Sequence, residues 1–499
     1  MGNHLIDALQ AASVETPERE FAFAPDGAAL CSFGDLFDGA ARLAGVLQRA
    51  GVQPGDRVAV QVAKTLEAVQ LYLGTVKAGG VFLPLNTAYT TDEVAYFVGD
   101  AAPRVLVCAP SRADALAGIA GSARVLTLDA GGEGSLFDDL GAAVAPVARG
   151  ADDLAAILYT SGTTGRSKGA MLSHANLASN SETLRDLWRF TSDDVLIHAL
   201  PIFHTHGLFV ATNVALLAGA QVVFLPGFDA DAILQAMPRA TALMGVPTFY
   251  TRLLSDDRLD RNRVENMRLF ISGSAPLLAS THEEWEARTG HRILERYGMT
   301  ETNMSTSNPY DGERRAGTVG FPLPGVELRI MDGEQEVAQG EIGVIEVRGP
   351  NVFQGYWQMP EKTAEELRPD GWFITGDQAF VDADGYVTIV GREKDMVISG
   401  GFNVYPKEVE GLIDALPGVK ESAVIGVPHP DFGEAVVAVV VPDGTGEVPD
   451  VGAALEGKLA KFKQPKRVIV LEELPRNTMG KVQKKALRED YAGLFDPAG

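Results

Sequence analysis

The first third of the chain alternates between helical and strand-like spacing of its hydrophobic residues. Apolar side chains over 33–51 recur at helical spacing, and Gly51 marks the expected end of that helix. The short apolar runs 57–63 and 81–86 predict strands, and a helical stretch over 67–80 separates them. Because strands and helices alternate, we expect a parallel sheet covered by helices.

The same alternation continues farther along the chain. Thr90 and Glu93 form a predicted capping box for a helix that precedes a strand over 104–109. The apolar runs 243–247 and 268–274 predict two more strands, and a helical stretch follows each. We therefore expect an α/β fold, in which a large N-terminal domain holds parallel or mixed sheets flanked by helices.

The pattern changes near residue 320. Over 320–392, short strands alternate with Gly, Pro and Asp turns, which predicts a small β-rich layer. The rest of the chain reads as helix, two strands and a last helix over 452–462, which is typical of a compact α+β domain. We expect an N-terminal domain over 1–391 and a C-terminal domain over 392–499.

Composition and charge narrow the possible functions. The 499 residues include 43 basic and 66 acidic side chains, so the formal net charge is −23. This balance argues against nucleic acid as a general partner and requires local positive groups around any anionic ligand. The two cysteines, Cys31 and Cys108, fit a reducing compartment. No apolar run reaches ~18 residues, so we expect a cytoplasmic protein without a membrane span.

The strongest local signal is the segment YTSGTTGRSKG over 159–169, which follows an apolar strand. Glycines let backbone N–H groups approach an anion, hydroxyl groups donate further hydrogen bonds, and the cations neutralise charge. This combination suits a polyphosphate, although a shorter match of this kind would be an ordinary connecting loop. It is not a Walker A loop, because Lys168 precedes Gly169 and no helix is predicted to start there.

Four further motifs occur in register with this loop. They are RYGMTETN (296–303), ITGD (374–377), GREKDMVISGGFNVYP (391–406) and LPRNTMGK (474–481). Together the five motifs resemble the adenylate-forming superfamily of acyl-CoA synthetases, luciferases and peptide-synthetase adenylation domains, over roughly residues 30 to 485. The resemblance implies a two-step reaction. A carboxylate attacks the α-phosphate of ATP with Mg²⁺, and the thiol of coenzyme A then displaces AMP from the acyl-adenylate.

The resemblance also assigns roles to individual residues. It implies that the phosphates are bound by Thr160, Ser161, Gly162, Thr163, Thr164, Gly165 and Lys168. It implies that adenine is bound by Gly273, Ser274, Ala275 and Tyr297. The ribose would be bound by Asp377 and Arg392. Glu301 would bind Mg²⁺, and Thr300 would donate to the α-phosphate. Without this context, Asp377 reads as a turn residue and Glu301 as an acid at a helix start.

Lys481 is the residue that the resemblance makes catalytic, because the final-motif lysine reaches from the small domain to the reacting phosphate. The C-terminal domain would then be mobile. It would rotate about Lys394 and bring Ser399, Gly400 and Gly401 to the site for coenzyme A. Two adjacent glycines leave room for a narrow pantetheine tunnel.

Within the superfamily, PIFHTHGLF, GGFNVYPKEVE and PRNTMGKVQK look most like malonyl-CoA synthetases. A dicarboxylate such as malonate needs a cation for its second charge. We expect Arg252 to supply it, with Ser272 donating a hydrogen bond and His204 and Met299 in the same pocket. Arg252 in a surface ion pair is the alternative. Arg268 is excluded because it starts its strand, and α/β sites gather at the carboxyl ends.

The main hypothesis is therefore an ATP-dependent ligase that joins a small dicarboxylate, malonate or methylmalonate, to coenzyme A. Three alternatives stay open: a ligase for short-chain, medium-chain or aromatic monocarboxylates, an adenylation enzyme that loads a carrier protein, and a non-catalytic nucleotide-binding protein. The last has no reason to keep Lys481, Glu301 and the double glycine together.

Overall fold

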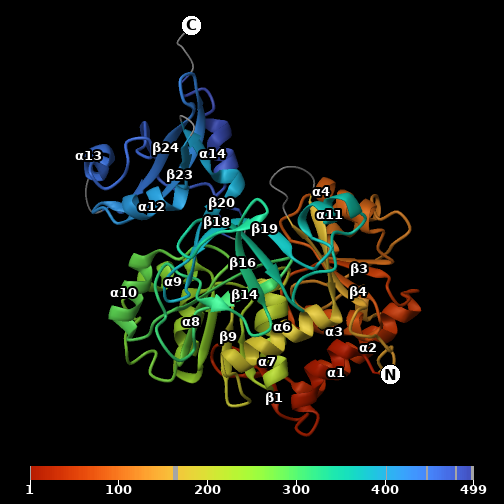
Figure 1. Cartoon of the computed structure of the whole chain (residues 1–499). Helices are drawn as coiled ribbons and strands as arrows, with labels where there is room; N and C mark the ends of the chain where they lie inside the picture. The colour runs from red at the N-terminus through yellow and green to blue at the C-terminus, as the bar shows by residue number, and fades with distance from the viewer. Residues whose placement is uncertain (1, 161–166, 400–401, 445–447, 478–479, 496–499) are drawn as a thin grey trace.

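The computed structural model describes residues 2–160, 167–399, 402–444, 448–477 and 480–495. Figure 1 shows a large N-terminal part and a smaller C-terminal domain, drawn in blue, that forms a separate lobe. The described residues form four sheets, three in the N-terminal part and one in the C-terminal domain. The expected α/β class, with a β-rich layer and a small α+β domain, is confirmed.

The largest sheet has nine strands and is parallel at its centre. Its order is β15 (Phe321–Pro322), β14 (Asn303–Ser307), β13 (Leu294–Met299), β12 (Leu269–Ser272), β11 (Ala242–Gly245), β9 (Val195–His198), β10 (Gln221–Phe224), β1 (Glu20–Phe23) and β2 (Ala29–Ser32). Strands β1 and β9 to β13 pair in parallel, whereas both edges are antiparallel. The carboxyl ends of β11, β12 and β13 therefore lie side by side, which is where α/β folds place ligands.

The second sheet has six strands, and in the sequence they come before most strands of the first sheet. Its order is β6 (Arg124–Thr127), β5 (Val105–Cys108), β3 (Arg57–Gln61), β4 (Val81–Pro84), β7 (Leu154–Thr160) and β8 (Lys168–Ser173). All neighbours pair in parallel except β7 and β8, which are antiparallel. This exception lets the chain turn back directly at the expected phosphate loop.

The β-rich layer predicted over 320–392 is an antiparallel five-stranded sheet. Its order is β17 (Gln335–Glu336), β16 (Glu327–Asp332), β18 (Gly343–Arg348), β19 (Phe373–Val381) and β20 (Val387–Arg392). Residues Glu393–Asp395 then form one 3₁₀ turn before the C-terminal sheet starts at Val397. Figure 1 shows β18, β19 and β20 beneath the C-terminal lobe.

The C-terminal sheet is buried on both of its faces. It consists of β22 (Phe402–Val404), β21 (Val397–Ser399), β24 (Gly433–Pro442), β23 (Val419–His429) and β25 (Arg467–Val470), the last parallel to β24. Alternate residues of β24 pack into two different apolar clusters, Val436, Ala438 and Val440 on one face and Val437, Val439 and Val441 on the other. The apolar run 435–441 is thus a central strand.

Helices cover the sheets. They are α1 (His4–Gln10), α2 (Phe33–Arg49), α3 (Leu66–Lys77), α4 (Thr91–Ala101), α5 (Ala113–Ala117), α6 (His174–Leu187), α7 (Asn213–Ala218), α8 (Ala230–Ala236), α9 (Pro247–Leu254), α10 (Ala279–Thr289), α11 (Pro360–Glu366), α12 (Pro406–Asp414), α13 (Val451–Leu455) and α14 (Lys484–Asp490). Among the described residues, none of these helices combines the length and apolar character needed to cross a lipid bilayer.

Local signals explain where two of these helices begin and end. The predicted capping box is present, because the Thr90 side chain accepts from the Glu93 N–H and the Glu93 carboxylate accepts from the Thr90 N–H. The helix expected over 452–462 is present only up to Leu455, where α13 ends, so its predicted C-terminal bound was wrong. Gly457 has φ +76°, a left-handed conformation that stops a helix.

Candidate active site

Strands β7 and β8 frame the expected phosphate loop. Thr160 and Lys168 lie opposite each other in this antiparallel pair. Five residues predicted to bind phosphate lie outside the described residues, namely Ser161, Gly162, Thr163, Thr164 and Gly165. Because β8 begins at Lys168, a strand and not a helix follows the loop, as the sequence predicts.

A hydrogen-bonded chain joins Lys168 to Glu301. The Lys168 Nζ lies 2.9 Å from the Glu366 carboxylate and 3.0 Å from the Tyr356 hydroxyl. That hydroxyl lies 2.5 Å from Glu366 and 2.9 Å from Glu301 Oε1. Burial raises the pKa of Glu301 above its usual value. The expected phosphate and metal residues are therefore coupled through two side chains, Tyr356 and Glu366, that lie in none of the motifs.

The chemistry of Glu301 fits Mg²⁺. This hard cation binds through one or two carboxylates and completes its shell with phosphate oxygens and water. Within the described part of the chain there is no group of three or more His, Cys, Asp or Glu side chains that could cage a metal by themselves. A buried carboxylate that Tyr356 links to Lys168 at the start of β8 is a suitable ligand for a nucleotide-bound Mg²⁺.

Tyr297, Asp377 and Arg392 meet in one place. Asp377 on β19 and Arg392 on β20 are opposite partners of an antiparallel pair, with Arg392 Nε 2.9 Å from Asp377 Oδ1. The Tyr297 hydroxyl on β13 donates to Asp377 Oδ2 at 2.6 Å. The carboxylate raises the pKa of Arg392, which keeps its charge. Tyr297, one of the expected adenine residues, and the two expected ribose residues thus form one contiguous surface.

Lys481 reaches this surface from the C-terminal domain. A methyl group placed on the neighbouring Gly480 would lie 3.6 Å from the Thr248 hydroxyl on α9. The Lys481 side chain keeps part of its area exposed. Its pKa nevertheless lies below the usual lysine value, because desolvation and Arg392 disfavour the ammonium ion more than Asp377 favours it. The C-terminal domain therefore presents its lysine to the N-terminal site.

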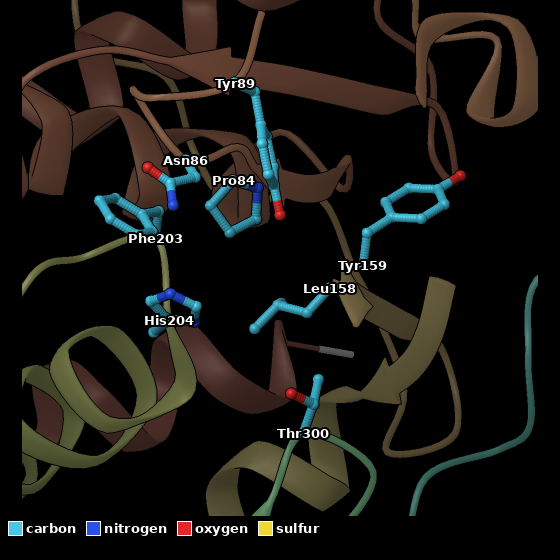
Figure 2. Close-up of a pocket in the computed structure, with 8 residues that line it drawn as sticks. All are labelled: Pro84, Asn86, Tyr89, Leu158, Tyr159, Phe203, His204 and Thr300. Carbon is cyan, nitrogen blue, oxygen red and sulfur yellow. The ribbon is translucent and has the colours of Figure 1, made fainter. Parts of the chain in front are cut away.

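Thr300 and His204 line one small pocket, shown in Figure 2, together with Pro84, Asn86, Tyr89, Leu158, Tyr159 and Phe203. His204 is followed by a buried π-helix over His206–Thr212. Burial and the charge of Lys481 lower the pKa of His204 to about 3. The imidazole is therefore neutral, and its buried Nε2 has no partner among the described residues.

Sequence reasoning missed Arg296, a residue of the motif RYGMTETN. Arg296 on β13 is 3% exposed, and its Nε and Nη2 have no hydrogen-bond partner in the described part of the chain. Burial lowers the pKa of Arg296 to about 9, which still leaves the guanidinium charged at neutral pH. A Cβ on Gly273 would clash with this guanidinium, so a larger residue there would force the Arg296 side chain to move. The position of Arg296 inside the quoted motif RYGMTETN was the available signal.

Other buried polar atoms without partners surround Arg296. Ser272 on β12 is 1% exposed, and its hydroxyl has no partner among the described residues, like the Nε2 atom of His206. His206 Nδ1 lies 3.3 Å from the Ser274 hydroxyl, and Ser274 has φ +70°, a strained value for a non-glycine residue. Because buried polar groups are normally paired, this cluster is typical of a site that a polar ligand completes.

The remaining adenine and pocket residues flank this cluster. Ala275 follows Ser274 directly and is partly buried. Met299 ends β13, and its sulfur lies 4.0 Å from the Tyr297 hydroxyl. Both residues therefore belong to the carboxyl ends of β12 and β13, where the other predicted site residues gather.

Arg252 and Arg268 differ from Arg296 in their surroundings. Arg268 binds Asp194 at 2.7 Å at the amino end of β12, which agrees with its exclusion from the site. Arg252 on α9 is exposed and lies over the Phe228 ring at 5.4 Å. Within the described residues no carboxylate pairs with Arg252. It shares a helix face with Thr248, four residues earlier, so it lies at the outside of the site and is not buried in a pocket.

The residues expected to serve coenzyme A and the hinge lie in and beside the C-terminal sheet. Ser399 on β21 is buried and lies opposite Phe402 and Gly433. Gly400 and Gly401 lie outside the described residues. Lys394 occupies the 3₁₀ turn between the third and fourth sheets and is exposed. Desolvation and Arg392 lower the pKa of Lys394 to about 8.

Comparisons with known proteins agree with this geometry. The family model "AMP-binding enzyme" matches residues 9–357, and the model of the C-terminal domain of these enzymes matches residues 408–481. The chain is 35% identical over 482 residues to a malonate–CoA ligase from Arabidopsis thaliana, covering 88% of this chain and 78% of the relative. It is 38% identical over 472 residues to a feruloyl-CoA synthase from an Amycolatopsis species, covering 93% and 95%.

Two solved structures of MatB from Rhodopseudomonas palustris bear on the arrangement of the domains. Both are 60% identical to this chain and cover 99% of it and 100% of their own length. The TM-score is 0.97 for the ATP-bound structure and 0.86 for the apo structure, so the present structure follows the ATP-bound arrangement more closely. The matched families and the assembled site together show that this chain belongs to the AMP-binding enzyme family.

Proposed function

We propose that this chain is an ATP-dependent ligase that activates malonate as an acyl-adenylate and transfers it to coenzyme A, releasing pyrophosphate and then AMP. The observation that carries the proposal is the buried, unpaired guanidinium of Arg296 next to the docked Lys481. A buried charge without a partner destabilises the fold unless an anion binds next to it. Relatives named malonate–CoA ligases support the same substrate.

In the first half-reaction, a carboxylate oxygen of malonate attacks the α-phosphate of ATP and pyrophosphate leaves. Lys481 supplies a fixed positive charge where negative charge develops, and Thr300 donates to the same phosphate. Glu301 holds Mg²⁺, which neutralises phosphate charge when bound. Tyr297 and the backbone at Gly273, Ser274 and Ala275 hold adenine, and Asp377 and Arg392 hold the ribose.

The β- and γ-phosphates are held by the residues of the phosphate loop, namely Thr160, Ser161, Gly162, Thr163, Thr164, Gly165 and Lys168. Lys168 also forms an ion pair with Glu366, so this carboxylate and the phosphates share one cation.

The second carboxylate of malonate keeps its charge throughout the reaction. Arg296 meets it with its free N–H groups, and Ser272 donates a hydrogen bond. His204 and Met299 close the apolar side of this pocket, and Arg252 attracts the dianion at the outside of the site. A monocarboxylate lacks the charge that Arg296 needs, so it would leave the guanidinium buried without a partner.

In the second half-reaction, Lys481 must leave so that the thiol can reach the carbonyl carbon of the adenylate. The N-terminal domain (1–391) and the C-terminal domain (392–499) rotate relative to each other about Lys394. This rotation brings Ser399, Gly400 and Gly401 to the site. The different TM-scores against ATP-bound and apo MatB support two arrangements of one pair of domains.

A pyrophosphate-release assay with malonate, methylmalonate, acetate, hexanoate and coumarate tests the proposal. We expect turnover with malonate, and with methylmalonate to a smaller degree, and we expect AMP and malonyl-CoA once coenzyme A is added. Turnover with acetate or hexanoate that equals the turnover with malonate would refute the dicarboxylate assignment. Replacing coenzyme A by a phosphopantetheinyl carrier protein tests the carrier-loading alternative.

A second candidate is a ligase for an aromatic acid. It is favoured by the identity of 38% to a feruloyl-CoA synthase, which exceeds the identity to the plant malonate–CoA ligase. The buried charge of Arg296 argues against an apolar ring in the same pocket. Coumarate in the substrate panel decides between the two candidates.

A further inference from the structure

A tight turn over 300–302 joins β13 to β14 and carries two of the predicted site residues, Thr300 and Glu301. Asn303 follows the turn, pairs with Met299 across the hairpin and has φ +50°, a left-handed conformation that non-glycine residues rarely adopt. The Asn303 side chain is buried, and neither its Oδ1 nor its Nδ2 has a hydrogen-bond partner in the described part of the chain. The unusual backbone at Asn303 must therefore be held by other residues.

Asn351 holds the backbone on both sides of Asn303. Its Nδ2 donates to the carbonyl oxygen of Thr302 at 2.8 Å and to that of Met304 at 3.1 Å. Two residues later, the Phe353 N–H donates to the carbonyl oxygen of Glu301 at 2.8 Å. The segment 351–353 thus binds three consecutive stretches of the hairpin that presents Glu301.

Two asparagines of α6 support this arrangement from the other side. Asn180 exchanges two hydrogen bonds with the backbone of Met304, because its Nδ2 donates to the carbonyl oxygen at 2.8 Å and its Oδ1 accepts from the N–H at 3.2 Å. Asn176 Nδ2 donates to the carbonyl oxygens of Pro350 and Val352, both at 2.8 Å. These two bonds fix the peptide groups that flank Asn351.

The same asparagines tie the hairpin to the strand that follows the phosphate loop. Asn176 Oδ1 accepts from the N–H of Ser173, the last residue of β8, and so completes the capping box of α6. The first residue of β8 is Lys168. We name the three buried asparagines the asparagine brace, namely Asn176, Asn180 and Asn351. The brace therefore connects β8 to the turn that carries Glu301.

We propose that the asparagine brace positions Glu301 and thereby sets the affinity of this site for the Mg²⁺ complex of ATP. The brace contacts only the backbone around the turn, so its members are positioning residues. Groups that hold a metal ligand in place are known to tune metal affinity, because a misplaced carboxylate binds the ion poorly. This inference rests on the proposed function, because it deepens nucleotide recognition at the same site.

The test compares the Kd of ATP with Mg²⁺ and the Kd of ATP with EDTA, both measured by titration calorimetry without malonate or coenzyme A. Asn351→Leu keeps a branched side chain of similar shape but removes both donors. We expect the preference for the Mg²⁺ complex, taken as the ratio of the two Kd values, to fall by about 10- to 100-fold. A merely structural defect would lower the fraction of molecules that bind and leave the ratio unchanged.

Asn308→Leu is the matched control. Asn308 follows β14, is as buried as Asn351, and also donates to two backbone carbonyls, those of Glu295 and Thr318 at 3.2 and 2.8 Å. Its loss should lower the unfolding temperature in the same way but leave the ratio of Kd values at the wild-type level. Asn180→Ala is a second brace variant for the case that Asn351→Leu does not fold, and it should lower the ratio as well.

A wild-type ratio in the folded brace variants, or an equal decrease with Asn308→Leu, would overturn the inference. Equal Kd values with Mg²⁺ and with EDTA in the wild-type protein would overturn it too, because Glu301 would then hold no metal. A wild-type protein that prefers the Mg²⁺ complex but releases no pyrophosphate with malonate would instead count against the proposed function.

Discussion

The N-terminal domain holds its candidate site residues on buried strands, whereas the C-terminal domain presents Lys481 from an exposed loop. Asp377 and Arg296 are 4% and 3% exposed and lie within β19 and β13. Lys481 belongs to no helix or strand, and its loop is closed by the hydrogen bonds that its backbone forms with Asn477. Under the proposed mechanism, the strands pre-position groups that both half-reactions use, and the loop carries Lys481, which only the first half-reaction needs.

This difference explains how one site performs two reactions. A cation fixed permanently at the α-phosphate would block the path of the incoming thiol. A cation on a separate lobe, which touches the N-terminal domain near Thr248, can leave without disturbing the buried groups. The following predictions test whether the strand residues serve both half-reactions and whether the loop residue Lys481 serves only the first.

The largest expected effect is the loss of adenylation in Lys481→Ala. Removing one preorganised positive group from the transition state costs about 10²–10³ in rate. Malonate-dependent pyrophosphate release should fall by that factor, while thioester formation from supplied malonyl-adenylate should persist. Lys485→Ala, an exposed lysine of the same domain, is the control. Equal loss of both half-reactions would contradict the assignment of Lys481 to the adenylation step alone.

The next effect concerns the strand-borne Arg296. We expect Arg296→Met to lower kcat/KM for malonate by about 100-fold relative to acetate, because the second carboxylate loses charge-assisted hydrogen bonds. The same variant should unfold at an equal or higher temperature, since a buried, unpaired charge is replaced by an apolar side chain. Calorimetry and the substrate panel measure both. An unchanged preference for malonate would remove Arg296 from the pocket.

A smaller effect is expected at the junction of the two parts. Lys394→Pro fixes φ at this position, so it should favour one arrangement of the domains. The two half-reactions, measured separately, should then differ by about tenfold in their response. A variant whose two half-reactions respond equally would argue against a hinge at Lys394.

The smallest expected effect is that of Arg252→Ala. The exposed guanidinium acts through solvent, where charge interactions are weak. We expect the preference for malonate over acetate to fall by about two- to fivefold. A loss as large as that of Arg296→Met would instead make Arg252 the principal partner of the second carboxylate, as the sequence alone suggests.

Much of the fold and part of the site could be predicted from the sequence. Hydrophobic spacing predicted the parallel sheets, and the motif order predicted that Tyr297, Asp377 and Arg392 share a nucleotide site. The three residues do meet, although their individual roles are proposals. The C-terminal bound of the helix predicted over 452–462 was wrong, because one left-handed glycine, Gly457, outweighs an amphipathic pattern.

The missed residues depend on long-range packing that no local pattern encodes. Tyr356 and Glu366 belong to none of the motifs, and only the folded chain brings them to Lys168 and Glu301. Arg296 stood inside a quoted motif, but its isolation from every carboxylate in the described residues is a property of the packed sheet. The sequence favoured Arg252 instead, because exposure cannot be read from helical spacing alone.

A reversible cross-link between the two parts tests the central claim most directly. Thr248 and Gly480 lie close enough for a Thr248→Cys/Gly480→Cys pair to form a disulfide, and the native Cys31 and Cys108 are both buried. A side chain at Gly480, where φ is +73°, costs roughly 1–2 kcal/mol, which the reduced protein controls for.

With the bond closed, the enzyme should release pyrophosphate from ATP and malonate but form no malonyl-CoA. Reductant should restore thioester formation. Malonyl-CoA produced at the same rate by the oxidised and reduced forms would show that the lobe need not move, and would contradict the account.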